Sequence, residues 1–157
     1  MNKIDCFMET LLKFIMGLAT LILSVVTALQ VVARFIFSNP IAWGQDIIRL
    51  SFVYLVFFGG AYCVHTNEHL NIDAFINLFS EKNKKILSIF IECIVFIFFI
   101  FLIYYGSIFV KTGINQKAPY LPISMSLYYF SLPLSSFLMA YFELRKIITL
   151  LKGGAKK

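Results

Sequence analysis

Four long apolar runs constrain this chain more than any other feature of its sequence. The runs at 14–33 and 123–142 contain no charged residue, the run at 47–64 contains only Arg49, and the run at 86–110 contains only Glu92. A helix needs about 20 predominantly apolar residues to cross the hydrocarbon core of a bilayer. Because 60% of the residues are hydrophobic and only 14% are charged, the chain lacks the polar surface that a soluble fold requires. The sequence therefore predicts an all-α integral membrane protein with four transmembrane helices.

The run lengths and the turn residues between them suggest where the helices lie. We expect helices at about 11–37, 40–66, 84–111 and 122–150, within a single membrane domain that spans residues 1–157. Asn39 is a favourable N-cap, and Pro40 suits the first position of the second helix. The first run is too long for a signal-peptide core and no small-residue cleavage site follows it, so we interpret it as a retained helix. Pro133 is expected to kink the fourth helix and to free a carbonyl that a neighbouring group, Ser131 or Ser135 would satisfy.

The distribution of basic residues predicts the orientation of the chain. With the N-terminus inside, ten of the 14 Lys and Arg residues fall on cytoplasmic segments, and only Arg34, Arg49, Lys111 and Lys117 fall outside. This bias predicts a multi-pass protein of the bacterial inner membrane with both termini in the cytoplasm. The net charge of +6 is then a topology signal and an attraction to inner-leaflet lipids. We expect no nucleic-acid partner, because the basic residues are scattered over separate flanks.

A short amphipathic helix is predicted at about 71–80, between the second and third spans. Its apolar residues follow the i, i+3, i+4, i+7 spacing of a helix with one hydrophobic face: Ile72, Phe75, Ile76 and Phe79. With basic residues directly after it, this helix should lie flat on the inner leaflet and contact membrane lipids. A surface-exposed loop helix is the alternative.

A polar cluster is expected at the outer ends of the first two helices. Asp46 and Arg49 are three residues apart and can pair on one helix face, while Trp43 suits the membrane interface as an anchor. The cluster either holds a partner or fastens the first helix to the second; its members are Arg34, Trp43, Gln45, Asp46 and Arg49. Gly59 and Gly60 in the second span indicate close packing against another helix.

The remaining ionisable residues do not form a recognisable catalytic, cofactor or metal site. Glu92 is expected to pair with a cytoplasmic residue such as Lys85, and a proton path is the alternative. His65 and His69 are four apart without an evident third ligand, which favours a structural role at the interface. The three cysteines show no C-x-x-C spacing and are interpreted as small buried residues. The sequence therefore predicts that the protein is not an enzyme.

Four helices without central charges or paired broken helices also differ from a complete transporter. This leaves an accessory or scaffold subunit of a larger membrane complex as the favoured class. Two alternatives stay open at this point. One is the membrane anchor of a quinone-linked redox enzyme, and the other is a small homodimeric exporter that depends on Glu92.

The order and spacing of several motifs resemble a known family. These are Arg34-x5-Pro40-x2-Trp43-x2-Asp46-x2-Arg49, then Gly60-Ala61, then Glu68-His69-Leu70-Asn71-Ile72-Asp73, and finally Gln116-x2-Pro119-Tyr120-Leu121-Pro122-Ile123-Ser124 with Tyr129 and Pro133. Together they are similar to the small membrane (DctQ-like, or Q) subunit of tripartite ATP-independent periplasmic (TRAP) transporters. Gln45 departs from the pattern, because the family often has two acidic residues after the tryptophan.

The resemblance implies a specific role. In that family a large multi-span subunit carries the substrate and sodium sites and moves as an elevator, so no cofactor is expected in this chain. A periplasmic substrate-binding protein delivers an organic acid such as sialic acid or a C4-dicarboxylate. The small subunit would hold the scaffold of the large one and help to dock the binding protein. The candidate partner contacts are Arg34, Trp43, Gln45, Asp46, Arg49, Gly59, Gly60 and Lys117.

Overall fold

The computed structural model of this chain describes residues 3–38, 41–66 and 81–152. Four α-helices make up this part of the chain: α1 (Lys3–Phe35), α2 (Ala42–Thr66), α4 (Glu81–Gly113) and α5 (Ser126–Leu151). The predicted all-α fold is thus confirmed for these residues, with α1 beginning earlier than expected. The predicted amphipathic helix at 71–80, with Ile72, Phe75, Ile76 and Phe79, lies outside the described residues, as does His69.

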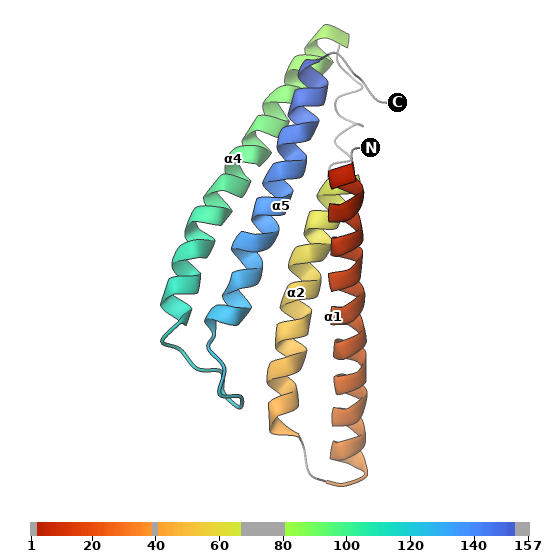
Figure 1. The fold of residues 1–157 in the computed structure, drawn as a ribbon, viewed down its shortest axis with the longest axis vertical. Coiled ribbons are helices and arrows are strands. Elements are labelled where there is room, and N and C mark those ends of the chain that lie inside the picture. The colour runs from red at the N-terminus through yellow and green to blue at the C-terminus, as the bar shows by residue number, and fades with distance from the viewer. Residues whose placement is uncertain (1–2, 39–40, 67–80, 153–157) are drawn as a thin grey trace.

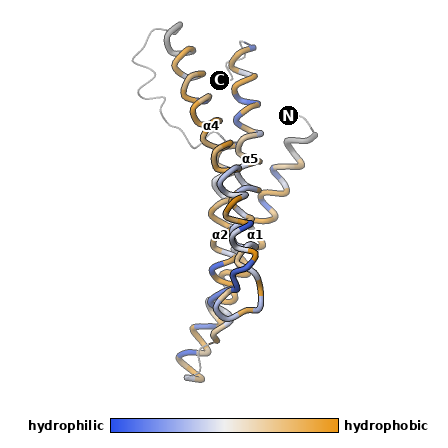
Figure 2. Tube along the Cα trace, turned by 90° about the vertical axis from the view of Figure 1, so that its left-hand side faces the viewer, coloured by the Kyte–Doolittle hydropathy of each residue, from blue (hydrophilic) through white to orange (hydrophobic). Residues whose placement is uncertain are grey.

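The four helices form a single layer in the spatial order α1, α2, α5, α4 (Figure 1). Helix α1 contacts α2, α2 contacts α5, and α5 contacts α4. Helices α2 and α5 are therefore central, and α1 and α4 form the edges. Turned by 90°, the helices overlap in a narrow column over the middle of the molecule (Figure 2). Helices α1 and α4 end where α2 and α5 begin, and we call this the loop end. The opposite end, where α1 begins and α5 ends, we call the terminus end.

Helix α4 contacts α5 through residues spaced seven apart. Glu92, Phe99, Gly106 and Gly113 are all buried, and a seven-residue spacing keeps side chains on one helix face. A Cβ on Gly106 would lie 3.1 Å from Cδ of Pro133, so the proline ring of α5 rests where α4 has no side chain. Close approach of the two helices therefore depends on glycine on one side and proline on the other.

Helix α5 is the most buried helix and also the least apolar. The segments long and apolar enough to cross a membrane are Phe7–Phe35, Ala42–Thr66 and Ile86–Gly113. Helix α5 falls short because small hydroxyl residues fill its contacts with its neighbours; Ser131, Ser135 and Ser136 are at most 1% exposed. The hydroxyls of Ser131 and Ser135 donate to the carbonyls of Tyr128 and Leu132. These are not the carbonyl of Tyr129, which Pro133 leaves without its helical donor.

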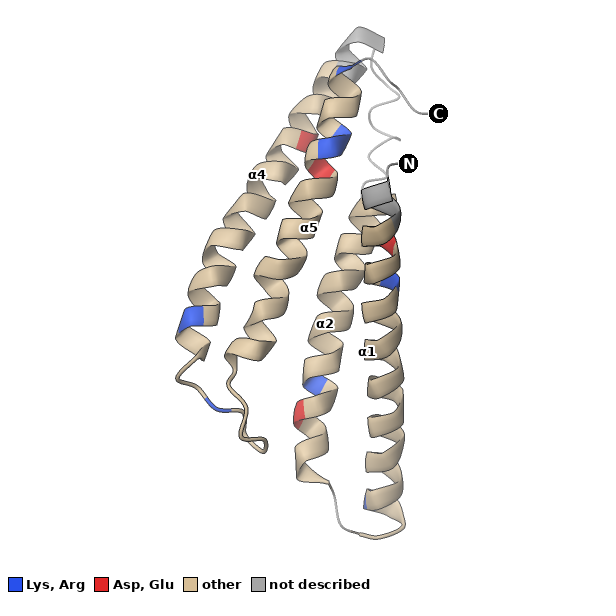
Figure 3. Cartoon of the chain, viewed as in Figure 1, with Lys and Arg blue, Asp and Glu red and all other residues tan. Residues whose placement is uncertain are grey.

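The apolar surface of the edge helices points outward. Phe7 and Phe14 on α1 and Ile97 on α4 are each about two-thirds exposed, and hydrophobic colouring runs along much of α4 (Figure 2). Lys, Arg, Asp and Glu lie toward the two ends and leave the middle without charge (Figure 3). Such a band of exposed apolar residues is favourable in lipid and unfavourable in water. The described helices are those of a membrane protein.

Candidate functional site

The loop end is organised by one buried carboxylate. Asp46 lies in the first turns of α2 and is fully buried. Its Oδ2 accepts hydrogen bonds from the main-chain N–H groups of Tyr120 and Leu121, at 2.8 and 2.9 Å. The main-chain carbonyl of Asp46 accepts a third hydrogen bond from the hydroxyl of Tyr128, at 3.1 Å. These contacts fasten the connection between α4 and α5, and the start of α5, to α2.

Asp46 therefore does not act as the sequence suggested. The expected ion pair between Asp46 and Arg49 is absent from the described residues, since Arg49 is exposed and Asp46 is directed to the main chain of the connection at 114–125. Oδ1 of Asp46 has no hydrogen-bond partner. A buried carboxylate that accepts two N–H bonds with one oxygen is held by charge-assisted hydrogen bonds, which are about twice as strong as neutral ones. Asp46 thus fastens the α4–α5 connection to α2, which is neither of the two roles expected for the outer cluster; those two roles stay predictions.

The connection at 114–125 has its own internal bonds. Ala118 N–H donates to Ile123 O at 2.9 Å, and Met125 N–H donates to Gln116 O at 2.8 Å. The hydroxyl of Ser124 donates to Gly113 O at 2.7 Å. A Cβ on Gly113 would fall 2.8 Å from the main-chain nitrogen of Ser126, so only glycine fits where α4 ends. The connection is thus a closed turn, docked on α2 through Asp46.

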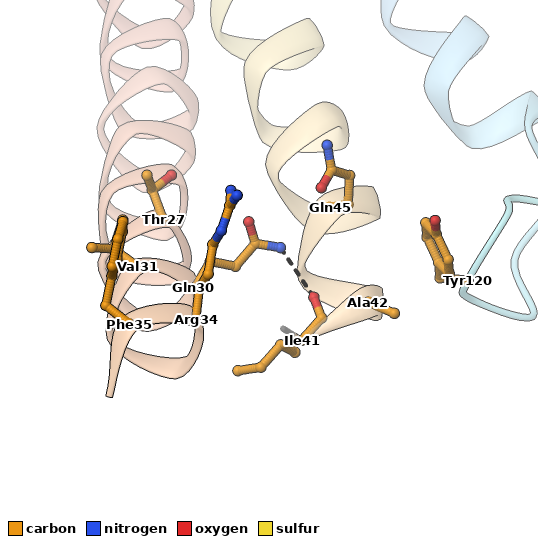
Figure 4. A pocket seen from close by; sticks show the side chains of 9 residues that line it. All are labelled: Thr27, Gln30, Val31, Arg34, Phe35, Ile41, Ala42, Gln45 and Tyr120. Carbon is orange, nitrogen blue, oxygen red and sulfur yellow. Dashed lines mark hydrogen bonds between the residues drawn. The ribbon is translucent and has the colours of Figure 1, made fainter. Parts of the chain in front are cut away.

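Near the hydrogen bonds of Asp46, a cavity of about 330 Å³ lies at the loop ends of α1 and α2. Its walls are Thr27, Gln30, Val31, Arg34, Phe35, Ile41, Ala42, Gln45 and Tyr120 (Figure 4). The amide of Gln30 donates to Ile41 O at 3.1 Å, which ties α1 to the start of α2. Arg34 extends along α1 with its guanidinium in the space between the two helices (Figure 4). Arg34 and Gln45, two of the predicted cluster residues, are therefore brought together, while Asp46 does not line this cavity.

The other predicted contact residues take two different positions. Trp43 is 45% exposed, and Arg49 and Lys117 are exposed as well, all at the loop end. Gly59 and Gly60 instead pack within the chain: a Cβ on Gly60 would lie 3.0 Å from Cε of Met139, and one on Gly59 would lie 3.9 Å from Cε of Met16. The predicted close packing of Gly60 is thus against α5. A role for either glycine toward a partner stays a prediction.

The terminus end holds a second group of ionisable residues that sequence reasoning only partly found. Nζ of Lys146 on α5 lies 2.5 Å from Oε1 of Glu92 on α4, so Glu92 pairs with Lys146. The expected partner Lys85 has its side chain outside the described part, and that pairing stays a prediction. Glu143 is 2% exposed, and its carboxyl group interacts with that of Glu92. Glu143 follows an uncharged run directly, and that position was the only signal for it in the sequence.

His65 lies in the last turn of α2, near the terminus end, and the structural role at the membrane interface that the sequence favoured for it stays a prediction. Its Nε2 lies 3.5 Å from Oε2 of Glu9 on α1, and its ring lies 4.6 Å from that of Phe142 on α5. Glu9 also pairs with Lys13 at 2.7 Å. His65 thus contacts both neighbours of α2. No group of three potential metal ligands occurs among the described residues, and Cys63 and Cys93 are free thiols.

The fold and these two polar groups define the class of the protein: an all-α membrane protein whose helices are tied together by polar contacts near each end. Residues 23–153 match the family of tripartite ATP-independent periplasmic transporters, DctQ component. Since the match covers most of the chain, the chain belongs to this family. It is a small permease subunit of the TRAP transporter kind, and these subunits are transport components and not enzymes.

Individual relatives agree with this assignment. The chain is 28% identical over 140 residues to a putative TRAP transporter small permease protein of Haemophilus influenzae strain KW20, covering 89% of this chain and 84% of that protein. It is 28% identical over 123 residues to the sialic acid TRAP transporter small permease protein SiaQ of Vibrio cholerae, covering 78% of this chain and 71% of SiaQ. It is also 32% identical over 77 residues, 49% of this chain, to the sialic acid TRAP transporter permease protein SiaT of H. influenzae strain 86-028NP, where the match spans only 12% of SiaT.

Proposed function

We propose that this chain is the scaffold subunit of a sodium-coupled transporter that imports an organic acid of the sialic acid or C4-dicarboxylate class. It binds a large elevator-type membrane subunit, which carries the substrate and sodium sites, and it helps to dock a periplasmic substrate-binding protein. The observation that carries this proposal is the family match over residues 23–153. The substrate class follows the printed names of relatives, which include SiaQ and the C4-dicarboxylate TRAP transporter small permease protein DctQ of V. cholerae.

The relation to SiaT supports a large membrane partner. The matched segment occupies 12% of that permease protein, so the rest of SiaT is several times longer than the part that resembles this chain. A small subunit that occurs as one part of a larger permease must lie beside the remainder in the same membrane. The family match leaves the alternative of a redox-enzyme anchor without support.

The proposed topology is that of a bacterial inner-membrane protein that crosses the membrane four times, with both termini in the cytoplasm. Helix α5 packs against both α2 and α4, and its 26 residues span about 39 Å at 1.5 Å per residue. A helix of that length alongside two apolar spans has to cross the same bilayer. Its buried serines are compatible with this position because they face other helices and not lipid.

In this orientation the loop end is periplasmic and forms the docking surface for the substrate-binding protein. Trp43, Arg49 and Lys117 are exposed there, and the described loop end carries four basic residues against one acidic residue, the buried Asp46. Positive surface charge favours a partner with an acidic face and raises the rate of encounter. The exposed apolar sides of α1 and α4 remain for lipid and for the large subunit.

Association with a large subunit is tested by purifying the tagged protein from its native membrane in mild detergent and identifying the bound chains by mass spectrometry. We expect a stoichiometric membrane protein with many predicted spans. Recovery of the chain alone, as a homodimer, or with a soluble redox enzyme would reject the proposal.

Docking is tested by charge reversal on the assembled transporter. We expect Arg49→Glu and Lys117→Glu to weaken binding of the substrate-binding protein and to slow uptake, with the loss reduced at high salt. Lys152→Glu is the matched control, because this exposed lysine lies at the terminus end. Unchanged affinity in both loop-end variants, or an equal loss in Lys152→Glu, would reject the docking role.

A further inference from the structure

The cavity at the loop ends of α1 and α2 is lined by a guanidinium and other hydrogen-bond donors and by no negatively charged group. Arg34 forms no ion pair with any described residue, and its guanidinium is directed into the space between the helices (Figure 4). The amide of Gln45 and the hydroxyl of Tyr120 line the same cavity. No carboxylate lines the cavity. Oδ2 of the nearby Asp46 accepts hydrogen bonds from main-chain N–H groups of the connection. The chemistry of these walls suits an anion.

The position of the cavity indicates where the anion comes from. Arg34 lies in the last turn of the apolar span Phe7–Phe35, and the half-exposed Trp43 opens α2 at the same end. Tryptophan at a helix end marks the level of the lipid headgroups. An exposed arginine at this level lies within reach of the phosphate layer of the membrane.

The apolar part of the lining fits a phosphate that carries an apolar body. Val31 and Phe35 are 52% and 78% exposed and continue the apolar surface of α1 away from the cavity. The volume of about 330 Å³ is at the lower end of the range for ligand sites, roughly 300–1,000 Å³. It admits a headgroup, while acyl chains would lie outside on α1.

We infer that this cavity binds the headgroup phosphate of a phospholipid, with Arg34 as its charged donor. The planar guanidinium offers two parallel N–H groups to phosphate oxygens, a geometry that lysine lacks. Gln45 and Tyr120 add donors from the other walls. The lipid links the end of α1 to α2 at a point where the protein's own cross-link is the bond from Gln30 to Ile41 O. The sequence suggested a protein partner for Arg34; in this inference its partner is a phospholipid instead.

The experiment is native mass spectrometry of the purified chain in detergent with added dioleoyl-phosphatidylglycerol. We expect the wild-type chain to retain one phosphatidylglycerol, and Arg34→Gln to bind it about tenfold more weakly, as for the loss of charge-assisted hydrogen bonds. Lys111→Gln is the matched control, because it removes an exposed charge from the same end without touching the cavity. Circular dichroism checks that the helices are intact. If Arg34→Gln fails to fold, Gln45→Leu replaces it, with a smaller loss expected.

Two further probes separate the sources of the ligand. Dioleoylglycerol, which has the same chains and no phosphate, should not be retained, and inorganic phosphate should not compete with phosphatidylglycerol. Equal losses in Arg34→Gln and Lys111→Gln would overturn the inference in favour of general surface charge. Retention of dioleoylglycerol, or displacement by inorganic phosphate, would overturn it as well. So would an isolated chain that retains no phosphatidylglycerol while Arg34→Gln weakens association with a protein partner.

Discussion

Asp46 holds the connection at 114–125 through two consecutive main-chain N–H groups, and this use of a carboxylate was not visible in the sequence. The spacing to Arg49 suggested a local pair, because residues three apart on a helix are neighbours. The N–H groups of Tyr120 and Leu121 lie more than 70 positions away along the chain. These part-buried main-chain donors face Asp46 directly, whereas the exposed Arg49 can bond to water.

Replacing Asp46 should loosen the loop end. We expect Asp46→Ala to lower the free energy of unfolding by about 2–3 kcal/mol, because two part-buried N–H groups lose a charged acceptor. Unfolding by SDS in mixed micelles reports this directly, since Trp43 is the single tryptophan and lies in the first turn of α2. Lys111→Ala serves as control, because its side chain is exposed at the same end. Equal stability of the Asp46 and Lys111 variants would show that the connection does not depend on the carboxylate.

The ion pair of Glu92 and Lys146 locks α4 to α5 near the terminus end. Lys146→Met removes the only cation shown to pair with Glu92, whose side chain is 10% exposed. We expect a loss of about 1–3 kcal/mol, less than the 3–5 kcal/mol for a fully buried pair, because 27% of the Lys146 side chain is exposed.

A double-mutant cycle separates the pair from general packing. Adding Glu92→Gln to Lys146→Met removes the unpaired charge, so the double variant should recover much of the lost stability in the same SDS titration. Additive losses would mean that the two side chains do not stabilise each other.

At the scale of single helices, the contact of α4 with α5 depends on where side chains are missing. Gly106 and Gly113 lie seven apart on the buried face of α4, and each meets atoms of α5 at a distance that leaves no room for a Cβ without movement. In a membrane, helix association relies on such close packing, because lipid supplies no hydrophobic driving force between helices.

Enlarging Gly106 should therefore separate the two helices. We expect Gly106→Val to cost about 1–3 kcal/mol through overpacking against Pro133. Gly17→Ala is a matched control on α1: nothing lies within 4 Å of a Cβ there, and alanine favours a helix over glycine by about 1 kcal/mol. Thermal unfolding in detergent compares the two. A Gly106→Val protein as stable as Gly17→Ala would place the α4–α5 contact elsewhere.

For the whole molecule, the single layer of helices has consequences that no single helix determines. It gives α2 and α5 two neighbours each and leaves α1 and α4 with one, so most of the surface is apolar and available to lipid or a partner. Polar contacts connect the helices near both ends: the bonds of Asp46 and of Gln30 at the loop end, and the Glu92–Lys146 and Glu9–His65 pairs at the terminus end.

The orientation of this layer in the membrane is testable by thiol labelling. In a background without native cysteines, Lys117→Cys should react with a membrane-impermeant maleimide in intact spheroplasts, and Lys152→Cys only after permeabilisation. Both positions are exposed, so access depends on the side of the membrane and not on burial. Labelling of both positions in intact spheroplasts would contradict an even number of crossings, and the reverse pattern would place the termini outside.

The sequence by itself determined the all-α class, the resemblance to the family and, apart from the earlier start of α1, the positions of the helices within a few residues. It could do so because long uncharged runs have few other stable structures. The tertiary structure decided which helices are neighbours and which partners the buried charges choose. Pairs such as Asp46 with Tyr120, or Glu92 with Lys146, join residues far apart in the chain, and local periodicity carries no information about such contacts. The burial of α5 was also decided by the tertiary structure. Its serines lower its hydropathy, and they permit the close packing that places it at the centre.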